Sequence, residues 1–189
     1  MGLPVTSVLT FVAFYASWFA CVVGAARGHT ALGPIVVAAC LLVHLRFARQ
    51  PAHEAVLILT VGLLGWLVDT GQAIAGVYTF PATSPLPWMC PPWLVAIWMI
   101  FASTLNGPMR WMGGRPVVAA LLGALGGPVS YFYGAQLGAI TLHADVSVSL
   151  TALVLVWAAV MPALCWLART IVTPDEAIAQ PATPAPSFL

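Results

Sequence analysis

Long apolar runs alternate with short polar connections along nearly the whole chain. The runs that approach the length of a membrane-spanning helix, about 20 residues at 1.5 Å each, lie at about 3–26, 31–45, 55–78, 93–112, 116–141 and 148–170. The fifth run contains Gly126, Gly127 and Pro128, so it is either one kinked helix or a re-entrant pair. The pattern predicts an all-α bundle of six transmembrane helices, with five as the alternative.

Composition supports a membrane protein. Hydrophobic residues make up 61% of the 189 positions and charged residues only 6%, with a mean hydropathy of +1.00, whereas soluble domains carry about 25% charged residues. The chain has no lysine, which excludes a P-loop and a lysine Schiff base. A net charge of +1 gives no nucleic-acid footprint. The cysteines show no CxxC spacing and the histidines no HExxH spacing, so we predict neither a metal nor a cofactor.

The arginines predict the orientation. Five of the six lie at one end of the predicted bundle, and only Arg27 lies at the other; the five are Arg46, Arg49, Arg110, Arg115 and Arg169. Because cytoplasmic connections are enriched in arginine, we expect residues 1–171 to form a multi-pass bundle with both termini in the cytoplasm. The Pro- and Ala-rich residues 172–189 are expected to form a disordered cytoplasmic tail.

Small and polar residues recur every three or four positions in the third, fourth and fifth runs, so each presents one such helical face. The faces consist of Gly62, Gly65, Asp69, Gln72 and Gly76, of Ala96, Met99, Ser103, Asn106 and Arg110, and of Ala120, Gly123, Gly127, Ser130 and Gly134. Polar groups are costly inside a bilayer. We therefore expect these three faces to meet one another and not the lipid.

Counting residues from the ends of the runs gives a depth for each polar side chain. Asp69 falls about 12–14 Å inside the outer end, and Ser103, Ser130 and Tyr131 about 15 Å inside. This places them in one polar layer, with Gln72 and Gln136 above it and Asn106 below. The predicted substrate-binding residues are therefore Asp69, Gln72, Ser103, Asn106, Ser130, Tyr131 and Gln136.

Asp69 permits two interpretations. An acid inside a membrane is a functional candidate by default, as a proton carrier, a cation ligand or an anchor for a substrate. The alternative is a structural acid that is neutral or hydrogen-bonded to Ser103, Tyr131 or a glutamine.

The charged residues at the cytoplasmic end also permit two interpretations each. Arg110 and Arg115 either bind lipid headgroups or serve only as anchors for the topology. Glu54 is most simply an ion-pair partner of the nearby arginines, and otherwise a catalytic acid paired with His44.

Several motifs resemble one family. The runs SWFACVVGAA, EAVLILTVGLLGWLVDTGQAIAG, PPWLVAIWMIFASTLN and GGPVSYFYGAQLGA follow one another in this order. Over about residues 5–170 they resemble the domain-of-unknown-function 2878 (DUF2878) family of bacterial inner-membrane proteins. The resemblance implies a bacterial cytoplasmic membrane location. It also implies a lipid-related role, because members are sometimes encoded beside fatty-acyl-modifying enzymes, but it assigns no activity.

Three functions remain open from the sequence. The first is a protein that binds or modifies a lipid or apolar small molecule in the polar layer around Asp69. The second is a non-catalytic scaffold or subunit for lipid-modifying membrane enzymes, suggested by Gly123 and Gly127, whose spacing allows close helix contact. The third is a small proton-coupled transporter acting as a homo-oligomer. The first and third need Asp69, whereas the second needs a membrane-protein partner.

Overall fold

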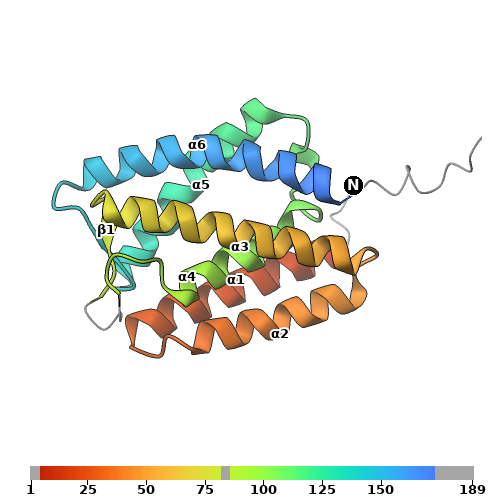
Figure 1. Ribbon diagram of the computed structural model, residues 1–189, viewed down its shortest axis with the longest axis horizontal. Helices are drawn as coiled ribbons and strands as arrows, with labels where there is room; N and C mark the ends of the chain where they lie inside the picture. Colours follow the sequence, from red (N-terminus) through yellow and green to blue (C-terminus); the bar gives the residue numbers. More distant parts are fainter. Residues whose placement is uncertain (1–4, 82–85, 173–189) are drawn as a thin grey trace, which may run out of the picture.

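The computed structural model describes residues 5–81 and 86–172, which form six antiparallel α-helices joined by short connections (Figure 1). The helices are α1 (Val5–Ala26), α2 (Leu32–Phe47), α3 (Pro51–Ile74), α4 (Pro92–Leu105), α5 (Pro116–Gln136) and α6 (Val146–Ile171). The start of α1 and the end of α6 lie at the same end of the bundle. The predicted disordered tail lies, apart from Val172, outside the described residues.

Proline and glycine set the helix boundaries. Three helices begin with a proline, which needs no hydrogen bond for its nitrogen at the first helical position; these are Pro51, Pro92 and Pro116. Three helices end before a glycine with a positive φ, namely Gly28, Gly76 and Gly138. At each glycine the next residue donates its N–H back into the last turn, as His29 does to the Gly24 carbonyl at 2.8 Å. All three glycine ends lie at one end of the bundle.

These proline and glycine positions correct the predicted ends of three helices. α3 ends at Ile74 and not at 78, and α5 ends at Gln136 and not at 141, because glycine ends each helix. α4 ends at Leu105 and not at 112, because Pro108 has no N–H to continue the helix. The Thr104 carbonyl instead accepts the N–H of Met109 at 3.0 Å. α5 runs unbroken through Pro128, so it is one helix and not a re-entrant pair.

The six helices differ in their ability to cross a bilayer. Four of them, α1, α3, α5 and α6, are long and apolar enough to do so. α2 has 16 residues and α4 has 14, lengths of about 24 and 21 Å against a hydrocarbon core of about 30 Å. The chain is therefore a helical membrane protein with four long candidate spans and two shorter apolar helices.

The short helix α4 occupies the centre of the bundle (Figure 1) and packs against α1, α2, α3 and α6. Two indoles fill the space beside it: Trp98 of α4 stacks on Trp157 of α6 with centroids 4.9 Å apart. Gly65 of α3 lies against the outer side of Trp98, and Gly127 of α5 lies against Trp157. This stack requires glycine on both sides, because a Cβ at either position would fall 2.1 Å from the indole Cγ.

The expectation that three small faces meet is correct for only two helices. Gly62 and Gly65 of α3 receive Met99 and Trp98 of α4, as expected. The glycine face of α5 packs instead on α6, where Gly123 lies against the backbone of Trp157. The search for faces of small residues does not reveal the pairing of α5 with α6. α6 has no such face and instead supplies the large side chains that fill the glycine face of α5.

A two-stranded ribbon closes the end of the bundle opposite the five arginines. Strand β1 (Tyr78–Thr79) pairs antiparallel with β2 (Thr141–Leu142) and so joins the α3–α4 connection to the α5–α6 connection. The Ser149 hydroxyl of α6 donates to the Val77 carbonyl at 2.5 Å and accepts the His143 N–H at 2.9 Å. The ribbon thereby fixes Tyr78 over the bundle interior.

The indole stack yields a prediction with a built-in control. Gly127→Ala should lower the free energy of unfolding by about 1–3 kcal/mol, since the new methyl group overpacks Trp157. Gly126→Ala, one residue earlier on the same helix, should be neutral or stabilising by up to about 1 kcal/mol, since no atom lies within 4 Å of its added Cβ. Unfolding of both variants in detergent, followed by circular dichroism, checks this; equal stability of the two would contradict the stack.

Candidate functional site

The Asp69 carboxylate is fully buried, with 0% of the residue exposed. It lies five residues before the end of α3 at Ile74, or about 8 Å from that end. The predicted depth of 12–14 Å is therefore too large, because α3 ends earlier than expected. Trp98 of α4 and Tyr131 of α5 lie at similar distances from the same end of the bundle, six and five residues from their helix termini.

Both carboxylate oxygens of Asp69 accept hydrogen bonds from the surrounding protein. Oδ1 accepts from the Tyr131 hydroxyl at 2.5 Å, the Tyr78 hydroxyl at 2.8 Å and Gln72 Nε2 at 3.3 Å. Oδ2 accepts from Trp98 Nε1 at 2.7 Å and has the Cys90 thiol 4.0 Å away. We call these residues, Asp69, Gln72, Tyr78, Cys90, Trp98 and Tyr131, the Asp69 cluster.

The cluster is suited to an ionised carboxylate that stays in place. Such a group offers about four lone-pair sites, and four donors reach it, three at Oδ1 and one at Oδ2. Burial, followed by the neighbouring Tyr131 and the Asp69 charge, raises the pKa of the Tyr78 hydroxyl well above its usual value, so Tyr78 keeps its proton and donates. Burial and then the Asp69 charge also raise the pKa of Cys90, which therefore remains a thiol.

Each donor comes from a different part of the chain, so the carboxylate connects them. Tyr78 belongs to the ribbon, Trp98 to α4 and Tyr131 to α5, while Asp69 itself belongs to α3. Next to it, Thr70 Oγ1 accepts the Cys90 N–H at 3.1 Å and holds the residues that lead into α4. The arrangement therefore holds these helices in position. Both Asp69 oxygens, which a substrate would need to contact, already accept hydrogen bonds from the protein.

Two residues predicted to lie with Asp69 do so, and four do not. Gln72 and Tyr131 donate to its carboxylate. The other four are Ser103, Asn106, Ser130 and Gln136. Ser103 donates within its own helix to the Ile100 carbonyl at 2.7 Å, and Ser130 accepts from Trp18 Nε1 at 2.9 Å. Gln136 is exposed at the last position of α5. Side chains predicted to lie in one polar layer therefore differ in their depth in the bundle and in the direction in which they point.

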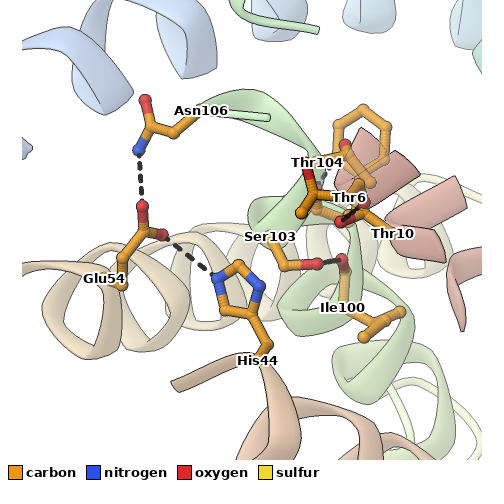
Figure 2. A network of polar contacts seen from close by, with 9 residues as sticks. Thr6, Thr10, His44, Glu54, Ile100, Ser103, Thr104 and Asn106 are labelled. Atoms are coloured by element: carbon orange, nitrogen blue, oxygen red, sulfur yellow. Dashed lines mark hydrogen bonds and ion pairs between the residues drawn. The ribbon is translucent and has the colours of Figure 1, made fainter. Parts of the chain in front are cut away.

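Asn106 belongs to a separate polar group at the opposite end of the bundle (Figure 2). There its Nδ2 lies 3.4 Å from Glu54 Oε1, while His44 Nε2 lies 3.5 Å from Glu54 Oε2. His44 is in the last turn of α2 and Glu54 in the first turn of α3, positions where the helix dipoles favour a cation and an anion. Glu54 thus contacts Asn106 and His44, the partner that the second interpretation of Glu54 named.

Two further predicted residues lie on the surface at that end. Arg110 and Arg115, the proposed lipid-headgroup residues, are both exposed in the α4–α5 connection. Among residues 5–81 and 86–172, no three His, Cys, Asp or Glu side chains come together as metal ligands would. The lipid-headgroup role of the two arginines stays a prediction.

Sequence reasoning missed three members of the Asp69 cluster: Tyr78, Cys90 and Trp98. Trp98 is adjacent in sequence to the polar face of α4 but outside its three- and four-residue spacing. Tyr78 falls at the end of the third predicted run, and only the glycine turn at Gly76 places it in the ribbon. The available signal was the need of a buried carboxylate for donors, which aromatic N–H and O–H groups nearby are able to supply.

An open, apolar hollow lies beside the Asp69 cluster. It has a volume of about 430 Å³ and is bounded by α2, α3 and α4 and by the residues leading into α4. Its lining consists of Pro34, Val37, Ala38, Leu41, Trp66, Met89, Cys90, Pro92, Val95, Ala96 and Met99. We call it the α2–α3 groove. Cys90 belongs to both the groove and the Asp69 cluster, so the carboxylate lies directly behind one groove wall.

The sequence belongs to a family whose function is not known. The family model described as "Protein of unknown function (DUF2878)" matches residues 7–163, which is most of the chain. The chain is therefore a member of the DUF2878 family, as its motifs indicated. No curated protein and no solved structure matches it.

The cluster predicts that Asp69 contributes strongly to stability. Asp69→Asn removes the charge and turns one acceptor into a donor facing other donors, which should lower the free energy of unfolding by about 2–4 kcal/mol. The control is Asp145→Asn, at the exposed N-cap of α6, where asparagine caps as well as aspartate. Thermal unfolding in detergent compares them; an unchanged melting temperature for Asp69→Asn would contradict a structural role for the carboxylate.

Proposed function

We propose that this protein is a lipid-binding membrane protein that holds one apolar chain in the α2–α3 groove. The observation that carries the proposal is the groove itself. Its volume of about 430 Å³ falls within the range of about 300–1,000 Å³ of small-molecule sites. Its lining is formed by aliphatic, proline, methionine and tryptophan side chains together with one thiol, which suits a hydrocarbon chain.

The helix arrangement supports access from the lipid. α2 and α3 follow one another and touch only lightly, while α4 contacts both and forms the floor between them. Ala38 lines the groove and is exposed on α2, so the groove reaches the surface that faces the bilayer. An acyl chain is therefore able to enter sideways without crossing a polar barrier.

The Asp69 cluster gives the groove a fixed wall. Trp66 lies on the same helix as Asp69, and Cys90 is held by Thr70 and lies against the carboxylate. A preformed apolar site loses less free energy to ordering when a ligand binds. The proposal therefore assigns Asp69 a positioning role: it fixes the groove without contacting the ligand.

We further propose that the membrane is the bacterial cytoplasmic membrane and that the arginine-rich end faces the cytoplasm. The support is the arrangement of the chain: the two helix connections with Arg46, Arg49, Arg110 and Arg115, and the end of α6 with Arg169, lie at one end. Positive residues are enriched on the cytoplasmic side of membrane proteins. The groove then opens in the outer half of the bilayer.

Filling the groove should remove the ligand. Ala38→Phe places a ring in the groove mouth, whereas Ala39→Phe places the same ring on a neighbouring exposed position of α2 that does not line it. Native mass spectrometry of the purified protein, after incubation with dioleoyl phospholipids, measures the bound lipid. We expect Ala38→Phe to retain at least about tenfold less lipid, the effect of about 1.4 kcal/mol, and Ala39→Phe to match the wild type. Equal retention by both variants refutes the proposal.

A further inference from the structure

A second hollow lies directly beside the end of the α2–α3 groove. It is formed by the α1–α2 turn, with Gly28, His29, Thr30, Ala31 and Leu32 as its lining. The groove begins at Pro34, only two residues beyond Leu32 in the first turn of α2. The two hollows are therefore neighbours along the chain, and the polar groups near the second are the exposed side chains of the α1–α2 turn.

The residue that precedes this hollow in the chain, Arg27, is exposed and positively charged. Arg27 and His29 are exposed on either side of Gly28. The exposed acid known at this end of the bundle is Asp145, whose carboxylate caps α6 by accepting from the Ser147 N–H and hydroxyl. Within residues 5–81 and 86–172, no carboxylate forms an ion pair with Arg27.

The position of Arg27 also lacks a topological reason. The other five arginines cluster at the opposite end, where the orientation rule favours them. An arginine on the far side works against that bias, so an interaction at this site is the simplest reason for its presence. Arginine is well matched to phosphate, because its planar guanidinium donates two parallel hydrogen bonds.

We propose that the ligand is an anionic phospholipid, with one acyl chain in the α2–α3 groove and its phosphate at Arg27 and His29. This inference rests on the proposed function of the groove and adds the chemistry of the headgroup. Thr30, also exposed in the turn, supplies a hydroxyl donor for the same headgroup. Charge favours a lipid with a net negative headgroup over a zwitterionic lipid, whose own ammonium group opposes the arginine.

The test uses an equimolar mixture of dioleoyl phosphatidylglycerol and dioleoyl phosphatidylcholine added to the full-length protein in detergent. Native mass spectrometry gives the ratio of the two lipids bound. The wild type should favour phosphatidylglycerol, and Arg27→Gln should reduce that preference by about tenfold, the effect of a lost charge-assisted pair. The matched control is Arg46→Gln, an exposed arginine at the opposite end, which should leave the ratio unchanged.

The variants separate this inference from the one on which it rests. If Ala38→Phe loses both lipids while Arg27→Gln keeps the wild-type ratio, the groove binds lipid and the headgroup inference is wrong. If Arg46→Gln removes the preference instead, the anionic site lies at the other end and the inference is also wrong. If Ala38→Phe retains lipid, the proposed function fails and the inference with it. Loss of the preference in Arg27→Gln alone, with total lipid retained, supports both.

Discussion

The fold depends on one buried carboxyl group. Placing a carboxylate inside a membrane protein is very costly unless its oxygens are hydrogen-bonded. Asp69 meets that condition only when Tyr131, Tyr78 and Trp98 reach it together. α3, α4, α5 and the ribbon therefore have one relative placement that satisfies the carboxylate, and others leave it unpaired. Such a group contributes to the uniqueness of the fold as well as to its stability.

The packing around this carboxyl group explains why a 14-residue helix lies in the centre. α4 is too short to cross the hydrocarbon core alone, yet it packs against four other helices. Its Trp98 serves both requirements, since the indole N–H binds Asp69 and the ring stacks on Trp157. The glycines on α3 and α5 provide the space for these large rings.

The same construction leaves α2 less tightly held. α2 contacts α1 and α4 closely but α3 only lightly, and its link to α3 at the arginine-rich end is the contact between His44 and Glu54 (Figure 2). The two helices thus meet near one end and leave the α2–α3 groove toward the other. The bundle is thus closely packed around Asp69 and open along α2. This arrangement is suitable for holding a lipid chain.

The membrane class, the six helices, their order and the family could be predicted from the residues alone, because these follow from apolar run length and from motifs along the chain. The sequence also identified Asp69 with Gln72 and Tyr131, because polar groups inside apolar runs are rare. It did not identify Tyr78, Trp98 or the groove. Those depend on side-chain direction and on which helices become neighbours: the glycine face of α5 packs on α6, while Tyr131 of α5 reaches Asp69 of α3. Only the tertiary structure decides such contacts, since helical spacing gives a face but neither its partner nor its depth.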